Sequence, residues 1–468
     1  MAAAGTVVAA ACGRIKAAGP TVATPRVVLN VILDIPSSDR LGSLSERNQL
    51  YTQSLAAFEA ANRAIAVRVL PYTSTAVIAA SIIGGTGPDV FADTAPSYPG
   101  YVGQHLLLRL NDYFTQDNID TSIWSSSVVD ALRTGNGTFA VSRGLDAFVF
   151  AVNLSLLDSL GISYPATDWS YTEFAGLAKE LTATVNGKHR YGVSLDGGPG
   201  GFLGTLNEVI SGFGGAVTDS TRTSQTLSSP ASLAGVEWLL KDVLLPAVGG
   251  DGVGSLYAQT AGMQEIQQVD LLSDYQLWRS TFKWVLYPPP VYPRGHVGGA
   301  AANFWAISGT TPHPEEAWSL LRWMSTEFPF QQFLMKTFLF PPALNALMPQ
   351  WQATAEAVAP GLKNRGLQWF TQSGQQGWGR AQPWFAYANT QALALDSALW
   401  KKILTGALSV QAGLTQADQQ VNALIAASAK ETSSLSAEVA AYQALHRRLE
   451  AMFAAGGPAG GAATPTGA

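Results

Sequence analysis

The sequence predicts a globular α/β protein with two lobes, and three observations lead to this prediction. The chain has 468 residues, which is more than one hydrophobic core usually holds. Short apolar segments of strand length alternate with segments of helical periodicity, as in βαβ units on a parallel sheet. Apolar residues make up 47% of the chain and charged residues only 13%, which is typical of a globular protein with a large core.

The first of these units lies near the N-terminus. Residues 27–33 are almost continuously apolar, which predicts a strand buried on both faces. Residues 55–61 carry apolar side chains at helical spacing, and residues 65–69 then alternate as a strand. A Gly- and Pro-rich break at 84–88 precedes a further short strand at 89–92. This order predicts parallel pairing of the three strands.

Two later segments carry strong helix-start signals. Ser170 and Glu173 have the spacing of a capping box, and Trp169 and Phe174 flank them as a hydrophobic staple would. Pro314 is followed by two glutamates, which suit the first turn of a helix. Near the C-terminus, residues 435–453 show an amphipathic helical pattern.

The two ends of the chain have the composition of unstructured segments. The apolar, small-residue run at 7–11 ends at Cys12, the single cysteine, and resembles a bacterial lipobox. No Lys or Arg precedes this short run, so an alanine-rich N-terminus with an incidental cysteine is the alternative. Residues 1–25 are interpreted as a signal remnant and tether, and residues 456–468 as a disordered Gly/Ala/Pro/Thr tail.

Several classes of chemistry lack their sequence signals. The chain has no G-x-S-x-G, H-E-x-x-H or phosphate-binding G-x-x-x-x-G-K-[ST] motif, and its five histidines are far apart. We therefore expect no metal and no cofactor. The net charge is −5 without a Lys/Arg block, which argues against nucleic acid as a partner. No apolar run reaches the roughly 18 residues of a membrane-spanning helix.

Five segments, in order, resemble the extracellular solute-binding proteins of the maltose-binding type. None is decisive alone, but their order and spacing together are specific. Three positions depart from the family pattern: Ala151 stands in place of a tyrosine, residues 257–285 lack a clear Gly/Ala/Met motif, and Ala343 replaces an arginine. The resembling segments are Phe58 to Val67, Gly87 to Tyr113, Asn153 to Thr182, Gly298 to Met324 and Gly413 to Leu424.

This resemblance implies a two-lobed, periplasmic-binding-protein-like (type II) fold with doubly wound sheets and a cleft flanked by hinges. Lobe 1 is expected to comprise residues 26–144 plus 286–345, and lobe 2 residues 145–285 plus 346–455. The implied function is solute capture for an ABC importer, without catalysis. The resemblance implies two kinds of partner: a small-molecule ligand, expected to be a sugar, and the permease subunits of the importer. We expect an extracytoplasmic, lipid-anchored monomer.

Aromatic side chains are the first candidates for ligand contacts, because sugar rings present apolar faces that stack on flat aromatic rings. Trp384 and Phe385 lie in an irregular segment at a position where the family often places a cleft aromatic. Trp305 follows a Gly-Gly pair that the resemblance places near the cleft. For each of them, a place in the hydrophobic core is the alternative.

Charged side chains are the second group of candidates. Asp146 lies where the family often carries an acidic ligand contact, and Arg143 is its close neighbour. Asp93 follows a strand at its carboxyl end, where open α/β sheets bind ligands. A structural pair between Arg143 and Asp146 is the alternative.

Two other functions remain open from the sequence. A secreted glycan-active hydrolase would need two facing carboxyl groups, for which Asp93 and Asp146 are the candidates. A ligand sensor for a membrane receptor would share the binding fold. The ligand itself is not specified, and polyol, glycerol phosphate or amine ligands stay possible.

Overall fold

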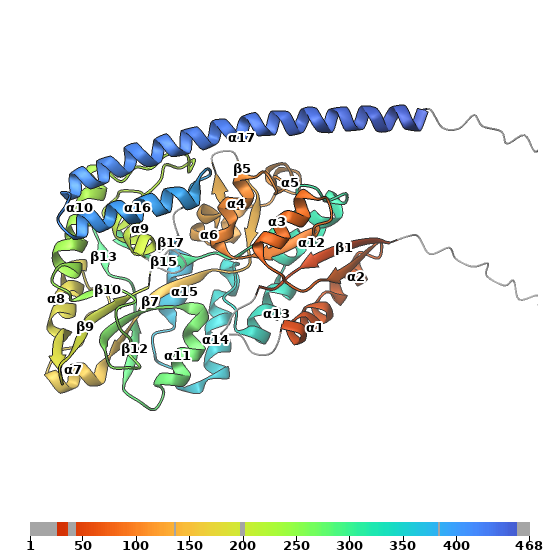
Figure 1. Ribbon diagram of the computed structural model, residues 1–468. Helices are drawn as coiled ribbons and strands as arrows, with labels where there is room; N and C mark the ends of the chain where they lie inside the picture. The colour runs from red at the N-terminus through yellow and green to blue at the C-terminus, as the bar shows by residue number, and fades with distance from the viewer. Residues whose placement is uncertain (1–25, 36–43, 135–136, 197–201, 382–383, 456–468) are drawn as a thin grey trace, which may run out of the picture.

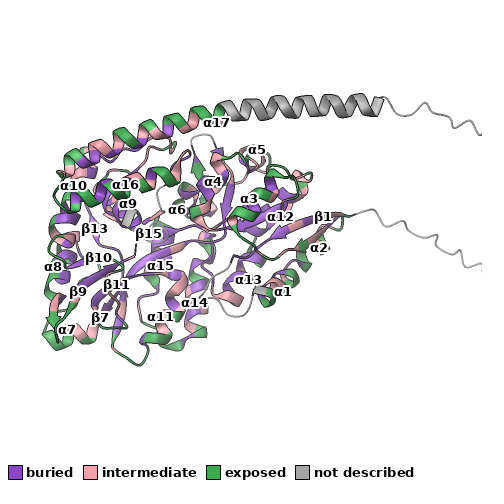
Figure 2. Ribbon diagram, viewed as in Figure 1, coloured by how far each residue is buried: buried purple, intermediate pink, exposed green. Residues whose placement is uncertain are grey.

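The computed structural model describes residues 26–35, 44–134, 137–196, 202–381 and 384–455, and the side chains of 434–455 are not described. It shows a two-lobed α/β fold with two large sheets, as predicted (Figure 1). Figure 2 shows that the strands are largely buried, while exposed residues gather on the outer helices. Residues 1–25, with Cys12, and the tail 456–468 lie outside the described residues.

The first sheet confirms the three strands that were predicted near the N-terminus. Its order is β2 (Ile65–Val69), β1 (Val27–Ile32), β3 (Val90–Asp93), β16 (Phe304–Ile307) and β6 (Ala140–Ser142). β1 pairs in parallel with β2 and β3, whereas β16 runs antiparallel to β3 and β6. Because parallel strands end at the same edge, the segments after β1 and β3 lie side by side.

The helices around this sheet follow from the sequence pattern. The helix predicted at Pro314 is α12 (Pro314–Thr326), whose apolar stripe faces the core. Its buried residues include Ala317, Leu320, Leu321 and Met324. The other helices packed in this region are α1 (Leu44–Ser54), α2 (Ala56–Ala61), α3 (Thr75–Ile83), α4 (Tyr98–Gly103), α5 (Asn111–Gln116), α6 (Ser126–Ala131), α13 (Phe328–Phe338), α14 (Met348–Val358) and α15 (Gln368–Gln376).

The second sheet mixes parallel and antiparallel strands. Parallel pairs join β9 to β10 and β11, whereas β7 runs antiparallel to β11, β12 and β15. β15 pairs in parallel with β17, and β8 pairs with β9. The bounds are β7 (Asp146–Asn153), β8 (Ala183–Val185), β9 (Lys188–Leu195), β10 (Gly249–Asp251), β11 (Ala261–Gln267), β12 (Trp284–Tyr287), β15 (Gly298–Ala301) and β17 (Gly379–Ala381).

The predicted capping box opens α8 (Tyr171–Leu181), which packs against the second sheet. The Ser170 hydroxyl accepts the Glu173 backbone N–H at 3.2 Å, and Glu173 accepts the Ser170 N–H at 2.7 Å. The Trp169 and Phe174 rings lie 5.3 Å apart, edge to face. Both signals are therefore confirmed, because each satisfies or covers a helix end that would otherwise be exposed.

The chain passes directly between the two sheets at two neighbouring places, and it crosses a third time through the helices between β16 and β17. It leaves β6 for β7 through residues 143–145, and it leaves β15 for β16 through residues 302–303. The Arg143 backbone N–H donates to the Asn303 carbonyl at 2.8 Å, which joins the two crossings. A Cβ at Gly144 would lie 1.9 Å from the Pro341 carbonyl oxygen, so only glycine fits there. The predicted boundary at 144–145 falls in the first crossing, whereas the predicted boundary at 285–286 falls within β12, before the second crossing. The lobe boundaries stay a prediction.

Strand β7 belongs to both hydrophobic cores. Ala147, Val149 and Ala151 pack in the larger core, which also holds the first sheet. Phe150 and Val152, which point to the opposite face, pack in the core beneath the second sheet. This alternation follows from the two-residue period of a strand. It makes β7 a shared wall between the two cores.

Two helices cover the second sheet near the C-terminus: α16 (Asn389–Leu404) and α17 (Val410–Ala455). α17 is one helix of 46 residues that includes the amphipathic segment predicted at 435–453, and it extends past the body of the molecule (Figure 1). Helices α7 (Leu154–Leu160), α9 (Phe202–Gly212), α10 (Pro230–Trp238) and α11 (Leu271–Trp278) complete this half. Among the described helices, none is both long and apolar enough to cross a membrane.

Candidate functional site

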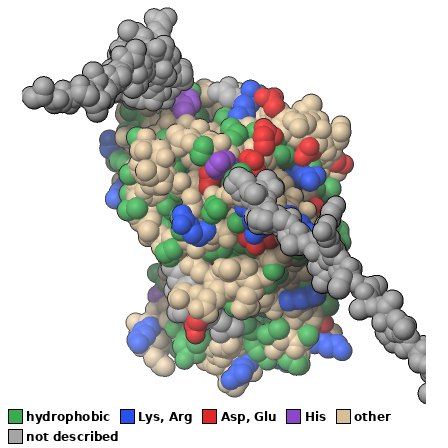
Figure 3. All heavy atoms as spheres, turned by 90° about the vertical axis from the view of Figure 1, so that its right-hand side faces the viewer, with side chains coloured by type: hydrophobic (Ala, Val, Ile, Leu, Met, Phe, Trp, Pro, Cys, Tyr) green, Lys and Arg blue, Asp and Glu red, His purple; other side chains and the backbone are tan. Residues whose placement is uncertain are grey.

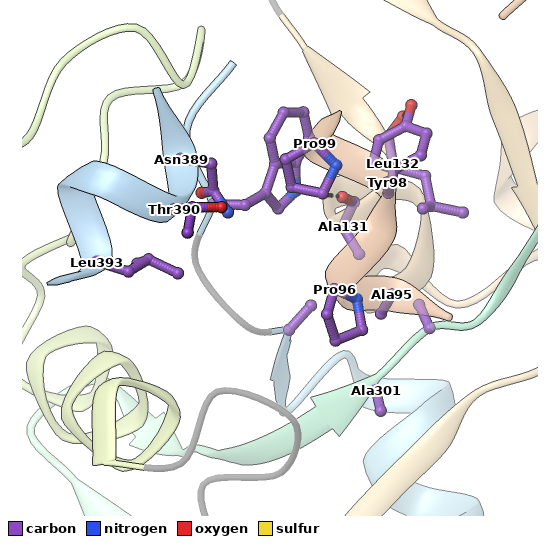
Figure 4. A pocket seen from close by; sticks show the side chains of 13 residues that line it. Ala95, Pro96, Tyr98, Pro99, Ala131, Leu132, Ala301, Asn389, Thr390 and Leu393 are labelled. Carbon is purple, nitrogen blue, oxygen red and sulfur yellow. Dashed lines mark hydrogen bonds between the residues drawn. The ribbon is translucent and has the colours of Figure 1, made fainter. Parts of the chain in front are cut away.

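A cavity of about 260 Å³ lies where segments of the two lobes face each other. Figure 4 shows Pro96, Tyr98 and Pro99 on one side of it, with Asn389 and Thr390 from α16 on the other. The two sides therefore come from the segment after β3 and from the first turns of α16. The full lining is Ala95, Pro96, Tyr98, Pro99, Ala131, Leu132, Ala301, Ala302, Ala381, Trp384, Asn389, Thr390 and Leu393.

The Asp93 carboxylate anchors the first of these walls. It accepts hydrogen bonds from the Tyr72 hydroxyl at 3.1 Å, the Tyr101 hydroxyl at 2.8 Å and the Thr94 backbone N–H at 2.7 Å. The Thr75 hydroxyl adds a fourth bond at 3.2 Å. Asp93 is fully buried, and these donors satisfy its charge. Its side chain holds the segment that leads into Pro96 and Tyr98.

Trp384 lines the cavity, where the sequence analysis placed a stacking aromatic. Its indole N–H donates to the Ala131 carbonyl at 2.9 Å, and its ring meets Tyr98 edge to face at 5.2 Å. The Arg222 guanidinium lies 4.7 Å from the ring centroid, which is cation–π distance. Trp384 therefore stands at the point where four distant segments of the chain meet.

A second, more polar cavity of about 140 Å³ adjoins the first and shares Ala131 and Ala381 with it. Arg222 and Arg380 both line it. Its other lining residues are Ser127, Asp130, Asn207, Ala216, Val217, Thr218 and Gly379. The two cavities together present an apolar chamber beside a polar, cationic one.

Two other predicted aromatic site residues, Trp305 and Phe385, lie in the core and not in the cavity lining. Trp305, in the middle of β16, is fully buried, and its indole N–H donates to the Leu33 carbonyl at 3.3 Å. Phe385 is fully buried in a small cluster with Val421 and Ile425. The physical reason is coverage: β16 has strands on both sides, and α17 lies over Phe385. For both aromatics the core alternative describes their surroundings.

Arg143 is fully buried at the crossing between the sheets. It forms an ion pair with Asp34 at 3.2 Å and donates to the Tyr51 hydroxyl at 3.1 Å. The Phe340 ring lies 5.1 Å from its guanidinium carbon. The partner of Arg143 is thus Asp34, and not Asp146 as the sequence alternative had it. These contacts give Arg143 a role in holding the crossing.

Asp146 begins β7 and is half-buried. Its carboxylate accepts the Val269 backbone N–H at 2.9 Å. Burial raises the pKa of Asp146 well above its usual value, and the neighbouring charges of Asp270 and Asp196 add to the effect. Neither Asp146 nor Asp93 belongs to the lining of the two cavities, so the carboxyl pair that a hydrolase would need does not face them.

A different carboxyl pair lies beneath the second sheet. Glu208 of α9 and Glu265 of β11 are both buried, and each carboxyl group affects the ionisation of the other. Burial raises the pKa of Glu265 to about 8, and burial together with repulsion from Glu265 raises the pKa of Glu208 well above its usual value. A proton shared between the two groups is the physical consequence. Among the described residues, no group of three or more side chains is arranged to hold a metal ion.

The two arginines of the smaller cavity, Arg222 and Arg380, were not predicted as site residues from the sequence. Arg222 and Arg380 are 158 positions apart by their numbers and share no local motif. Arg222 sits in the turn after Asp219 with a left-handed backbone, φ +58°, which no local pattern predicts. The sequence signal that does apply is for the larger cavity: Pro96 and Pro99 follow the Asp93 strand at its carboxyl end, where open α/β sheets bind ligands.

Solved structures of binding proteins share this fold. A sugar transporter protein of Rhizobium etli in an open conformation matches with TM-score 0.66 at 15% identity, covering 85% of this chain and 99% of that one. A cyclic α-maltosyl-1,6-maltose binding protein of Arthrobacter globiformis matches with TM-score 0.65 at 16% identity, over 86% and 99%. An ABC substrate-binding protein of Listeria monocytogenes, in complex with cycloalternan, matches with TM-score 0.62 at 18% identity, over 85% and 98%.

No curated protein matches the sequence. The model of the family described as bacterial extracellular solute-binding protein matches residues 42–327, which is more than half of the chain. That match covers the first sheet except β1, the second sheet except β17, and the two direct crossings between them. The predicted family and the two-lobed α/β fold are thereby confirmed, and the chain belongs to the bacterial extracellular solute-binding proteins.

Proposed function

We propose that this protein captures a carbohydrate in the cleft between its lobes and presents it to an ABC importer, without transforming it. The observation that carries the proposal is the 260 Å³ cavity with an aromatic and proline wall on one side and the Asn389 and Thr390 side chains opposite. Such a cavity suits a sugar, because apolar ring faces need flat walls and hydroxyls need polar groups. Two of the similar structures support this ligand class: the Listeria protein in complex with cycloalternan and the cyclic α-maltosyl-1,6-maltose binding protein of Arthrobacter.

The lobes are proposed to close around the ligand by bending at the two crossings. Residues 143–145 and 302–303 are short, adjacent and joined by a hydrogen bond, which is the arrangement of a hinge. Across the cleft, Arg222 donates to the Asp130 carbonyl at 2.8 Å and Trp384 donates to the Ala131 carbonyl at 2.9 Å. These bonds between distant segments are the contacts that opening would break.

The remaining expectations about location and assembly are part of the same proposal. Lipid anchoring through Cys12 would keep the protein outside the cytoplasm and near the permease subunits, and a monomer would present both lobes to them. Mass spectrometry of the mature protein from its native membrane tests the anchor, since an unmodified Cys12 would contradict it. Asp146 stays a proposed ligand contact, because this half-buried residue begins β7 directly beside the crossing.

The ligand proposal is tested by a thermal-shift screen against neutral and acidic sugars and polyols, followed by titration calorimetry. Replacing Trp384 by Ala removes one wall and should weaken binding of the best ligand by on the order of 1–3 kcal/mol, or about tenfold or more. Trp384→Phe keeps a flat ring without the N–H donor and should retain most of the affinity. If no compound raises the melting temperature, or if Trp384→Ala binds as wild type does, the proposed function fails.

A further inference from the structure

The smaller cavity in the cleft has a cationic character that a neutral sugar does not require. Arg222 and Arg380 both line its volume of about 140 Å³. Asp130, the one carboxylate in this lining, forms an ion pair with Arg133 at 2.9 Å. In the described part of the chain, neither cavity arginine forms an ion pair with a carboxylate. The whole chain carries a net charge of −5, so this concentration of positive charge is local.

Arg222 is held in place by its surroundings on three sides. The Asp219 carboxylate accepts the backbone N–H groups of Thr223 and Ser224, which fixes the turn around its left-handed backbone. The Arg222 carbonyl accepts the Ala386 N–H at 2.8 Å. Its guanidinium lies over Trp384 and donates only to the Asp130 carbonyl, at 2.8 Å. The turn therefore aims the cation at the cleft.

Arg380 is anchored by one nitrogen and leaves the others available. Its Nη1 donates to the carbonyls of Gly377 at 2.9 Å and Gly379 at 3.1 Å. In strand β17 it stands opposite Gly299 and is half-buried. Burial lowers the pKa of Arg380 below its usual value and that of Arg222 to about 10, so both remain protonated at neutral pH.

A third group in the same lining lacks a partner. Ser127 is 5% exposed, and its hydroxyl makes no hydrogen bond within the described residues. A buried hydroxyl without a partner is costly, on the order of 1–3 kcal/mol, unless a ligand or water completes it. The cavity thus combines two cations bound only to carbonyls with one unsatisfied hydroxyl, all of them able to donate to an anion.

We propose that this cavity is an anion subsite, and that the solute is a carbohydrate bearing a carboxylate or a phosphate ester. The sugar ring would occupy the larger cavity beside Trp384, while its charged group would reach Arg222, Arg380 and Ser127. Arginine suits this task because its planar fork bonds carboxylate and phosphate oxygens in pairs. The inference rests on the proposed function, since it places a charged group on the same ligand.

The test compares matched neutral and charged probes by titration calorimetry. Glucose and galactose are set against glucuronate, galacturonate and glucose 6-phosphate, and inorganic phosphate is titrated alone. The charged sugars should bind roughly tenfold or more tightly than their neutral counterparts, since charge-assisted bonds are the stronger ones. Their advantage should shrink as salt is raised, and glucuronate against glucose 6-phosphate tells carboxylate from phosphate.

Variants assign the effect to the cavity. Arg380→Gln should remove most of the preference for the charged sugar, whereas Arg380→Lys should keep part of it. Arg63→Gln is the matched control, because Arg63 is exposed and lies outside both cavity linings. It removes the same charge and should change nothing. Melting temperatures of all three variants report whether folding is intact.

The outcomes separate the two proposals. Neutral sugars that bind as tightly as charged ones overturn the anion subsite and leave the proposed function standing. Inorganic phosphate that binds in an Arg380-dependent way, with no sugar binding at all, supports the subsite and overturns the carbohydrate function. Binding of none of the probes overturns both.

Discussion

Beside the first sheet, the buried Arg143 faces the carboxylate of Asp34 at 3.2 Å, whereas beneath the second sheet the buried Glu208 faces another carboxyl group, Glu265. An opposite-sign pair offsets the cost of removing both charges from water, while a like-sign pair forces at least one group to keep its proton. Burial therefore leads to an ion pair, Arg143 with Asp34, beside the first sheet, and to a carboxyl pair that keeps a proton beneath the second sheet. The cleft arginines, Arg222 and Arg380, follow neither pattern, because they have only carbonyl partners.

The largest expected effect concerns the buried ion pair between Arg143 and Asp34 at the crossing. Arg143→Ala leaves Asp34 buried with Arg47 as its remaining partner and opens space beside Phe340, so we expect a loss of about 3 kcal/mol in the free energy of unfolding. Urea denaturation measures it. Arg222→Ala is the comparison, and its loss should stay under about 1 kcal/mol, because its guanidinium is partly open to the cleft. Equal losses in the two variants would mean that Arg222, like Arg143, contributes mainly to the stability of the fold.

The next effect is the pH dependence of the carboxyl pair. Glu265 and Glu208 both have raised pKa values in the folded protein, that of Glu265 about 8, whereas glutamate in an unfolded chain titrates near about 4.3. The folded state thus keeps protons that the unfolded state releases. The stabilisation is complete below about pH 4.3 and is lost as pH rises toward 8, by up to about 1.4 kcal/mol per pH unit for each retained proton.

Glu208→Gln checks this assignment. The amide cannot ionise and can donate to Glu265, so the decline in the free energy of unfolding between pH 5 and 8 should become shallower than in wild type. Asp396, whose pKa burial raises to about 7, contributes a decline of the same sign in both proteins and therefore cancels in the comparison. Parallel pH profiles for wild type and variant would show that the pair holds no shared proton.

The smallest effect is a local one, far from either buried pair. Ser170→Ala removes the hydroxyl that accepts the Glu173 N–H at the start of α8 and should lower the free energy of unfolding by about 1 kcal/mol. The change should not alter ligand affinity, because α8 lies outside both cavity linings. Ser170→Asp restores an acceptor and should recover most of the loss. A drop in affinity for Ser170→Ala would mean that the outer helices influence the cleft.

Local signals in the sequence predicted local structure well. The strands at Val27 and Ile65 and the cap at Ser170 each depend on residues within a few positions of one another. Trp305 and Trp384 show where this stops. Both tryptophans follow Gly-rich segments. Trp305 is buried because β16 has a strand on each side, whereas Trp384 lines the cavity. Which tryptophan lines the cavity depends on strand pairing, which spacing along the chain does not encode.

The cleft charges illustrate the same limit. Arg222 reaches the site through a turn that Asp219 closes, and Arg380 through a strand that pairs with β15. No spacing rule connects the two arginines. The family resemblance directed attention to Arg143 beside the hinge, but the structure gives that arginine an internal carboxylate as partner. Closeness to a hinge does not show whether an arginine is structural or available to a ligand. Its partners do: Arg143 is paired with a buried carboxylate, whereas Arg222 and Arg380 donate only to carbonyls.

The position of β7 has a consequence for how the molecule is made. Its odd-numbered residues complete one core and its even-numbered residues the other, so neither half can finish packing until this strand is in place. During synthesis, β7 leaves the ribosome long before β15 and β17, which extend the same sheet from residues 298–301 and 379–381. The nascent chain must therefore hold an unfinished β7 edge from residue 153 until residues 298–301 have been added. Chaperones that shield exposed strand edges would act in that interval.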